Sequence, residues 1–149
     1  MIGFIADIPA LMQQISDKTG KKYMSTITHV TVGTNDLDAS RTFWDFVLEP
    51  LGIKRHFDLD DRSGYGNDVP QFIVIRPING APATSGNGGT IGLVAPNRAS
   101  VDEFHRRALA AGGSDEGPGA ERPGAPHIYA AFIRDTHGHK VGAFFVGEQ

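Results

Sequence analysis

Polar and apolar residues alternate along residues 26–34, and the spacing then changes to three and four along residues 36–52. The first stretch is rich in β-branched residues, and its alternation places Val30 and Val32 on one side of a predicted strand. Asn35 and Asp36 follow, where their side-chain oxygens can cap the first N–H groups of a helix. Along that helix one stripe recurs at helical spacing and is expected to be buried: Ser40, Phe43, Val47, Leu48 and Leu51.

The same strand, turn and helix occur a second time further along the chain. A shift of 61 positions (90 − 29 = 61) carries His29 to Thr90 and Phe43 to Phe104 without a gap. Each unit is followed by three predicted strands, at 54–60, near Tyr65 and at 69–76 in the first half, and at 116–121, 127–134 and 139–146 in the second. The sequence therefore predicts a duplicated βαβββ module.

The repeat divides the chain into segments. Module one spans residues 25–76 and module two residues 90–149, and the turn-forming stretch 77–89 links them. Residues 1–24 precede the repeat, and an apolar stripe predicts a helical extension there: Ile8, Leu11, Met12 and Ile15. The extension is expected either to cover its own domain or to dock on a partner subunit, unless the natural start is Met24.

Composition narrows the classes of protein that fit. A chain of 149 residues with a net charge of −3 has the size of one domain and no basic cluster for nucleic acid or a membrane surface. It has no cysteine, which excludes thiol chemistry and agrees with a cytoplasmic location. No apolar run reaches the roughly 20 residues of a spanning helix, and no signal peptide is recognisable.

Four stretches of the duplicated module resemble the vicinal oxygen chelate superfamily: HVTVGTNDLDASRTFW, GNGG, APHIYAAFIRD and DTHGHKVGAFF. This superfamily includes glyoxalases, extradiol dioxygenases, fosfomycin-resistance transferases and bleomycin-resistance proteins. The resemblance covers residues 25–146 and implies an α+β fold. In such a fold two tandem modules form a curved mixed sheet around a cup, with the helices outside. It also implies a homodimer, because modules of this family commonly meet across subunits.

The resemblance implies where metal ligands would stand. Metal-using members have a histidine on the first strand of each module and a glutamate on the final strand, and these positions fall on His29, Thr90 and Gly142. A further position falls near Gln71 or Ile73. A transition metal needs three or four donors, threonine is a poor ligand, and glycine has no side chain. The sequence therefore predicts no metal site and no cofactor.

A single cup is expected to hold a small molecule, and the absent side chain at Gly142 is expected to leave room for a bulky one. His127 and Tyr129 are two residues apart on a strand and face one side, although a backbone hydrogen bond at a strand end is the competing explanation for His127. The predicted ligand-binding residues are His29, Tyr65, Gln71, Thr90, His127, Tyr129 and Gly142.

Two classes of function remain open. A metal-independent protein that binds a small molecule, as bleomycin-resistance members do, explains the missing ligands without further assumptions. The alternative is a lyase, isomerase or dioxygenase-type enzyme in which His29 is the catalytic base or part of a non-standard metal site, since imidazole titrates near neutrality. The sequence leaves open whether the protein is an enzyme.

Overall fold

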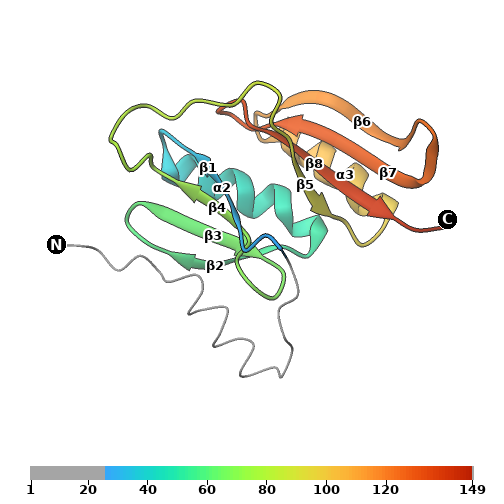
Figure 1. Ribbon diagram of the computed structural model, residues 1–149, viewed down its shortest axis with the longest axis horizontal. Helices are drawn as coiled ribbons and strands as arrows, with labels where there is room; N and C mark the ends of the chain where they lie inside the picture. Colours follow the sequence, from blue (N-terminus) through green and yellow to red (C-terminus); the bar gives the residue numbers. More distant parts are fainter. Residues whose placement is uncertain (1–25, 149) are drawn as a thin grey trace.

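The computed structural model describes residues 26–148, which form two successive βαβββ units (Figure 1). The first unit contains β1 (Val30–Gly33), α2 (Leu37–Leu48), a short 3-10 helix η1 (Glu49–Leu51), β2 (Lys54–Asp58), β3 (Arg62–Gly66) and β4 (Phe72–Ile75). The second contains β5 (Ile91–Val94), α3 (Arg98–Ala110), β6 (Ser114–Arg122), β7 (Ala125–Arg134) and β8 (Lys140–Val146). The α+β class and the two modules are confirmed, whereas the extension at 1–24 lies outside the described residues.

The two units follow each other at the predicted offset. Strands β1 and β5 begin 61 positions apart (91 − 30 = 61), and both helices begin one residue after a polar cap. The side chain of Asp36 accepts a hydrogen bond from the Ala39 N–H at 3.0 Å, and that of Asn97 accepts one from the Ser100 N–H at 2.8 Å. Each cap satisfies one N–H that the helix itself leaves without a partner.

The strands form two mixed sheets, in the orders β1-β4-β3-β2 and β5-β8-β7-β6. Strands β1 and β4 pair in parallel, as do β5 and β8, and the other neighbours are antiparallel. One curved sheet was expected, but no backbone ladder joins β1 to β5 in residues 26–148, so the sheets do not close. Figure 1 shows the two sheets side by side, with residues 76–90 crossing between them.

Both modules contribute to one hydrophobic core. The stripe of α2 predicted from spacing is buried, and Trp44 is fully enclosed between the rings of Phe43 and Phe72 at centroid distances of 4.9 and 4.8 Å. Helix α3 adds Val101 and Phe104 to the same cluster. Burying one such side chain stabilises the fold by about 1.5–3 kcal/mol, so the core is the main reason the modules stay together.

Alternation along the strands gives each sheet a second face that points away from this core, which we call its open face. In the first sheet Val32, Phe72 and Val74 pack in the core, so Thr31, Ile73 and Ile75 lie on the open face. In the second sheet the open face carries five residues whose neighbours in sequence belong to the core: Gly92, Val94, Phe132, Gly142 and Phe144.

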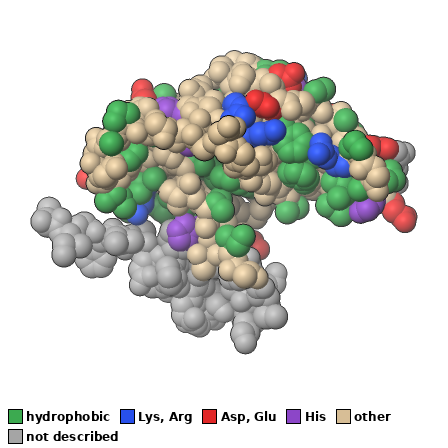
Figure 2. Space-filling model, turned by 45° about the horizontal axis from the view of Figure 1, so that its top comes forward, with side chains coloured by type: hydrophobic (Ala, Val, Ile, Leu, Met, Phe, Trp, Pro, Cys, Tyr) green, Lys and Arg blue, Asp and Glu red, His purple; other side chains and the backbone are tan. Residues whose placement is uncertain are grey.

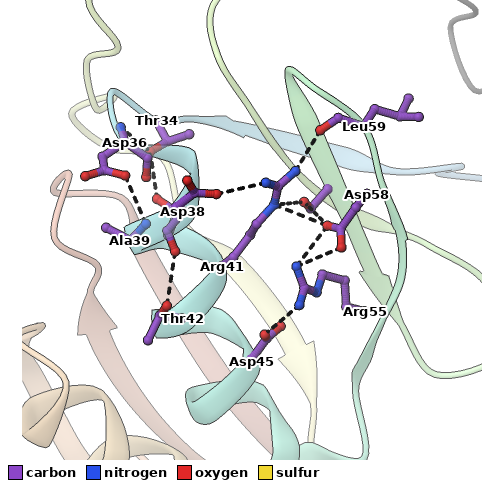
Figure 3. Close-up of polar contacts among 12 residues, drawn as sticks. Thr34, Asp36, Asp38, Ala39, Arg41, Thr42, Asp45, Arg55, Asp58 and Leu59 are labelled. Atoms are coloured by element: carbon purple, nitrogen blue, oxygen red, sulfur yellow. Dashed lines mark hydrogen bonds and ion pairs between the residues drawn. The ribbon is translucent and has the colours of Figure 1, made fainter.

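A polar network ties α2 to the turn between β2 and β3 (Figure 3). The guanidinium of Arg41 donates to the Ser63 hydroxyl and to the Leu59 carbonyl, both at 2.7 Å. Burial alone would raise the pKa of Asp58, but hydrogen bonds from Ser63 and Arg55 outweigh it and hold that pKa below its usual value. The network is therefore structural, and it orients the edge of the first sheet against its helix.

Two histidines of the β7–β8 turn connect the modules. The His139 Nε2–H donates to the Gly33 carbonyl at 2.8 Å, and the Asn35 N–H donates to His137 Nε2 at 3.1 Å. The nearly buried carboxylate of Asp135 accepts from the backbone N–H groups of both histidines and so shapes the turn. Polar residues in a turn are commonly explained by solvation alone, but both of these side chains have partners in module one.

His105 follows the buried Phe104 on α3, a place where a side chain that is merely solvated would be ordinary. Its Nε2 instead lies 2.8 Å from the carboxylate of Asp115 on β6, and only 13% of its side chain is exposed. Among residues 26–148, no helix is long and apolar enough to cross a membrane.

Candidate functional site

A cleft of about 360 Å³ lies where the edge strands β1 and β5 face each other. We call it the seam cleft. Module one lines it with Ile27, Val30, Ile53, Tyr65, Gly66, Asn67, Gln71 and Phe72, and module two with Thr90, Ile91, Gly92, Leu93 and Val94. Its walls are mostly apolar with a few polar side chains, which is the usual make-up of a site for a small organic molecule.

Gln71 and Thr90 bring polar groups to the cleft from opposite modules. The backbone of Gln71 is fixed on both sides, because its carbonyl accepts from the Val30 N–H and its N–H donates to the Tyr65 carbonyl, each at 2.8 Å. Thr90 stands just before β5 and is exposed. These two residues were predicted to line one site, and the structure places them around one cleft.

Tyr65 also lines the seam cleft, but its phenol is enclosed. The side chain is fully buried, and its ring lies 6.4 Å from that of Phe72. Burial raises the pKa of Tyr65 well above its usual range, and the nearby carboxylate of Asp45 adds to this effect. The hydroxyl therefore stays protonated near neutral pH, and the buried ring forms part of the cleft wall.

The space above Gly142 is filled by two aromatic rings. A Cβ atom at Gly142 would lie 2.8 Å from the Phe144 ring and 2.9 Å from the Phe132 ring, and one at its paired residue Gly92 would lie 3.0 Å from Phe144. The rings of Phe132 and Phe144 meet edge to face at 5.4 Å. The space that was expected to be free at Gly142 is thus occupied by the rings of Phe132 and Phe144.

Three further predicted residues do not line the seam cleft. His29 is half-buried, and its Nδ1 lies 2.9 Å from the Thr28 hydroxyl. The Tyr129 hydroxyl donates to Asp102 on α3 at 2.8 Å, so this side chain lies on the helix side of the sheet. His127 borders a separate shallow depression beside Arg98 and Glu121. The shared side of His127 and Tyr129 is therefore not the face that carries Phe132.

The residues at the expected ligand positions do not fit a transition metal. His29 is the one strong donor, since Thr90 offers a hydroxyl and Gly142 lies beneath two rings. Within residues 26–148 no three side chains of His, Asp or Glu come together in a way that could hold a metal ion. The donor chemistry falls short of the three or four ligands such ions take.

Sequence reasoning missed Asn67 and Phe132. The Asn67 amide donates to the Gly52 carbonyl at 3.0 Å, which holds its loop at the cleft wall. The alternation of Gly142 with Phe144 was visible in the sequence, and it places both residues on one face of a strand. What it could not reveal is that Phe132 on the neighbouring strand would turn its ring over the same glycine.

Comparison with known proteins places this geometry in a family. Residues 26–142 match the model of the Glyoxalase/Bleomycin resistance protein/Dioxygenase superfamily. A glyoxalase/bleomycin resistance protein from Albidiferax ferrireducens T118 is 38% identical, with a TM-score of 0.75 over 81% of this chain and 98% of that one. No curated protein matched.

More distant solved structures share the fold. A glyoxalase/bleomycin resistance protein/dioxygenase family enzyme from Burkholderia phytofirmans PsJN is 18% identical, with a TM-score of 0.63 over 79% of this chain and 96% of that one. Lactoylglutathione lyase from Agrobacterium tumefaciens is 20% identical, with a TM-score of 0.57 over 83% and 95%. From the match of its own sequence over residues 26–142, the chain belongs to the glyoxalase/bleomycin resistance protein/dioxygenase superfamily.

Proposed function

We propose that this member of the superfamily binds a small organic molecule in the seam cleft without using a metal. The observation that carries the proposal is the ring pair over Gly142 and Gly92. A side chain able to reach a metal from position 142 would have to displace both rings. The Phe144 ring also packs next to Gly92, a residue that lines the cleft.

The cleft offers shape and hydrogen bonds more than reactive groups. Its polar side chains are the amides of Asn67 and Gln71 and the hydroxyl of Thr90, and the one phenol is kept protonated by burial. Amides and hydroxyls orient a ligand but do not move protons near neutral pH. A base-catalysed reaction would need His29 as its base, but His29 does not line the cleft. Binding is therefore the function that these residues support best.

Elemental analysis of protein purified without chelator tests the metal-free half of the proposal. We expect no stoichiometric zinc, iron, nickel or manganese, because one imidazole is too small a donor set. His29→Ala removes that imidazole, and His105→Ala is the matched control on α3. One equivalent of metal that is lost in His29→Ala but kept in His105→Ala would overturn the proposal and favour an enzyme built around His29.

A thermal-shift screen of small molecules tests the binding half. Any ligand it identifies should bind with equal affinity in the presence and absence of a chelator. Gln71→Ala and Thr90→Ala should each weaken it about three- to tenfold, which is the worth of one neutral hydrogen bond. If the affinity of a ligand is unchanged by both substitutions, the ligand binds elsewhere and the seam cleft is not its site.

A further inference from the structure

Strand β5 presents its free edge to the seam cleft. It stands at the end of its sheet and pairs with β8 on one side, and Figure 1 shows it as the strand of the second sheet nearest to the first module. Five consecutive residues, 90–94, line the cleft. Side chains alternate between the two faces of a strand, so a cavity that touches every residue in turn lies along the edge of the strand and not above one face.

The backbone groups at this edge are not paired with another strand of residues 26–148. The Ala95 N–H donates to the Phe144 carbonyl of β8 at 2.8 Å, which fixes the direction in which the backbone groups of β5 point. Because that direction alternates along a strand, Leu93 turns its N–H and C=O toward β8, whereas Gly92 and Val94 turn theirs toward the cleft. An unpaired edge of this kind is a template for one more strand.

The walls of the cleft suit an uncharged guest with apolar side chains. None of the described residues that line it carries a formal charge at neutral pH, because the phenol of Tyr65 stays protonated. Module one contributes Val30, Ile53 and Phe72, and Val94 on β5 is 76% exposed. Figure 2 shows hydrophobic side chains reaching the surface on the half of the molecule that holds the second module. A charged group would lose hydration in the cleft without gaining an oppositely charged partner.

The position of this edge inside a cleft decides what can reach it. A single extended chain needs only the width of one strand, and its axis would lie about 4.8 Å from β5. The edge of a second folded copy would bring its whole sheet and helices against module one, which lines the opposite wall. The site therefore favours a lone strand over another folded sheet.

We propose that the seam cleft binds a short extended peptide, which adds to β5 as an extra edge strand. The peptide backbone pairs with the N–H and C=O groups of Gly92 and Val94, and its alternate side chains enter the apolar part of the cleft. The five residues 90–94 match a peptide of about five residues. This inference rests on the proposed function, because it names the ligand class of the same cleft.

Amide hydrogen exchange of the full chain tests the pairing directly. The probe is the uncharged peptide acetyl-VTVTV-amide, and NMR titration gives its dissociation constant. At about ten times that concentration the amides of Gly92 and Val94 should exchange about tenfold more slowly, because only the free fraction exchanges. The amides of Ile91 and Leu93, which face β8, should change little. No added protection of Gly92 and Val94 at saturation overturns the proposal.

The same spectra of the protein alone provide a control. If the Gly92 and Val94 amides are already protected without peptide, another segment of the chain or a second copy covers the edge, and the proposal is wrong. Exchange at the rate of unpaired amides is the result expected of an open edge.

Peptides with ester bonds separate backbone pairing from side-chain packing. An ester removes one N–H donor and leaves the side chains unchanged, and the two versions carry esters at two even or at two odd positions. Only one of these sets can face β5. One version should therefore bind at least about tenfold more weakly than the other, the effect of losing two neutral hydrogen bonds. Equal dissociation constants would rule out strand addition.

Val94→Pro removes one N–H of the protein that faces the cleft. Proline is tolerated where the N–H of an edge strand points away from its sheet, so the pairing with β8 should persist. Val94→Ala keeps the N–H and is the matched control. We expect the proline variant to bind the peptide at least about fivefold more weakly than the alanine variant, with similar melting temperatures. Equal affinities would contradict pairing at this position, and if the proline variant does not fold, the ester peptides decide the question.

The failure of this inference is distinct from failure of the proposed function. A ligand from the thermal-shift screen that depends on Gln71 and Thr90, yet leaves the Gly92 and Val94 amides unprotected, would overturn the peptide class. Binding in the seam cleft would still stand.

Discussion

Glycine at position 142 connects the packing of the second sheet with the chemistry of the site. Residue 142 faces away from the helices, at the position where the superfamily resemblance implied a carboxylate ligand. Here the backbone approaches the Phe132 and Phe144 rings so closely that even a methyl group would displace them. The absence of a side chain at this position and the close packing of the two rings are therefore one structural feature.

Gly142→Ala should lower the free energy of unfolding by about 1–3 kcal/mol, the usual penalty for overpacking a well-filled site. Gly89→Ala is the matched control, because a Cβ there meets nothing within 4 Å. The measurement is chemical denaturation of both variants and of Gly142→Ala combined with Phe144→Leu. Trimming Phe144 should recover part of the loss, and a double variant with strictly additive losses would contradict the packing described here.

At the scale of elements, helix α2 is attached to its sheet by polar contacts as well as by its apolar stripe. Arg41 on the helix and Arg55 on β2 both contact the carboxylate of Asp58 (Figure 3), at 3.2 and 2.8 Å. The folded chain holds the pKa of Asp58 below its value in the unfolded chain. The carboxylate therefore stabilises the fold fully above about pH 4, and this contribution is lost as the pH falls through the folded-state pKa.

Asp58→Asn should cost about 0.5–1 kcal/mol at pH 7, a modest figure because 47% of the Asp58 side chain is exposed and solvent screens the pair. The difference from wild type should shrink as the pH falls below about 4, because the unfolded-state carboxylate is protonated first and the folded-state one follows at its lower pKa. Denaturation at pH 7 and pH 3 measures it, with the exposed Asp60→Asn as control. An equal loss at both pH values would show that charge plays no part.

The elements of the fold could be predicted from the sequence because each depends on local spacing. The β-branched run at β1, the polar caps Asp36 and Asn97, and the apolar stripe of α2 all act within a few residues. The site depended on how strands and modules meet, which local spacing does not encode. The two-residue alternation of a strand placed His127 and Tyr129 on the same side. No nearby residue in the sequence indicated that the side chain of Tyr129 would face α3.

At the scale of the whole molecule, the two modules share a core while their sheets remain separate. Several large apolar side chains stay exposed on this single chain, among them Ile78 at 85% and Val94 at 76%. We propose that the protein is a homodimer, as the superfamily resemblance implied, since exposed apolar groups gain most from a second copy.

Light scattering at micromolar concentration should give twice the mass of one chain. The same measurement on a chain that lacks residues 1–23 asks whether the predicted extension takes part, since those residues lie outside the described structure. A monomeric mass for both proteins would count against the dimer and against the docking arm together.

The seam between β1 and β5 also bears on how such a protein can evolve. Where two sheets share a hydrogen-bond ladder, a larger side chain at the junction shifts register and pairing along a whole strand. Here the junction is spanned by side chains and by the contacts of His137 and His139, with no ladder among residues 26–148 to break. Substitutions at Gln71, Thr90 or Val94 can therefore change the volume and polarity of the cleft one residue at a time. The ligand specificity can therefore change through single substitutions that leave both sheets and their common core intact.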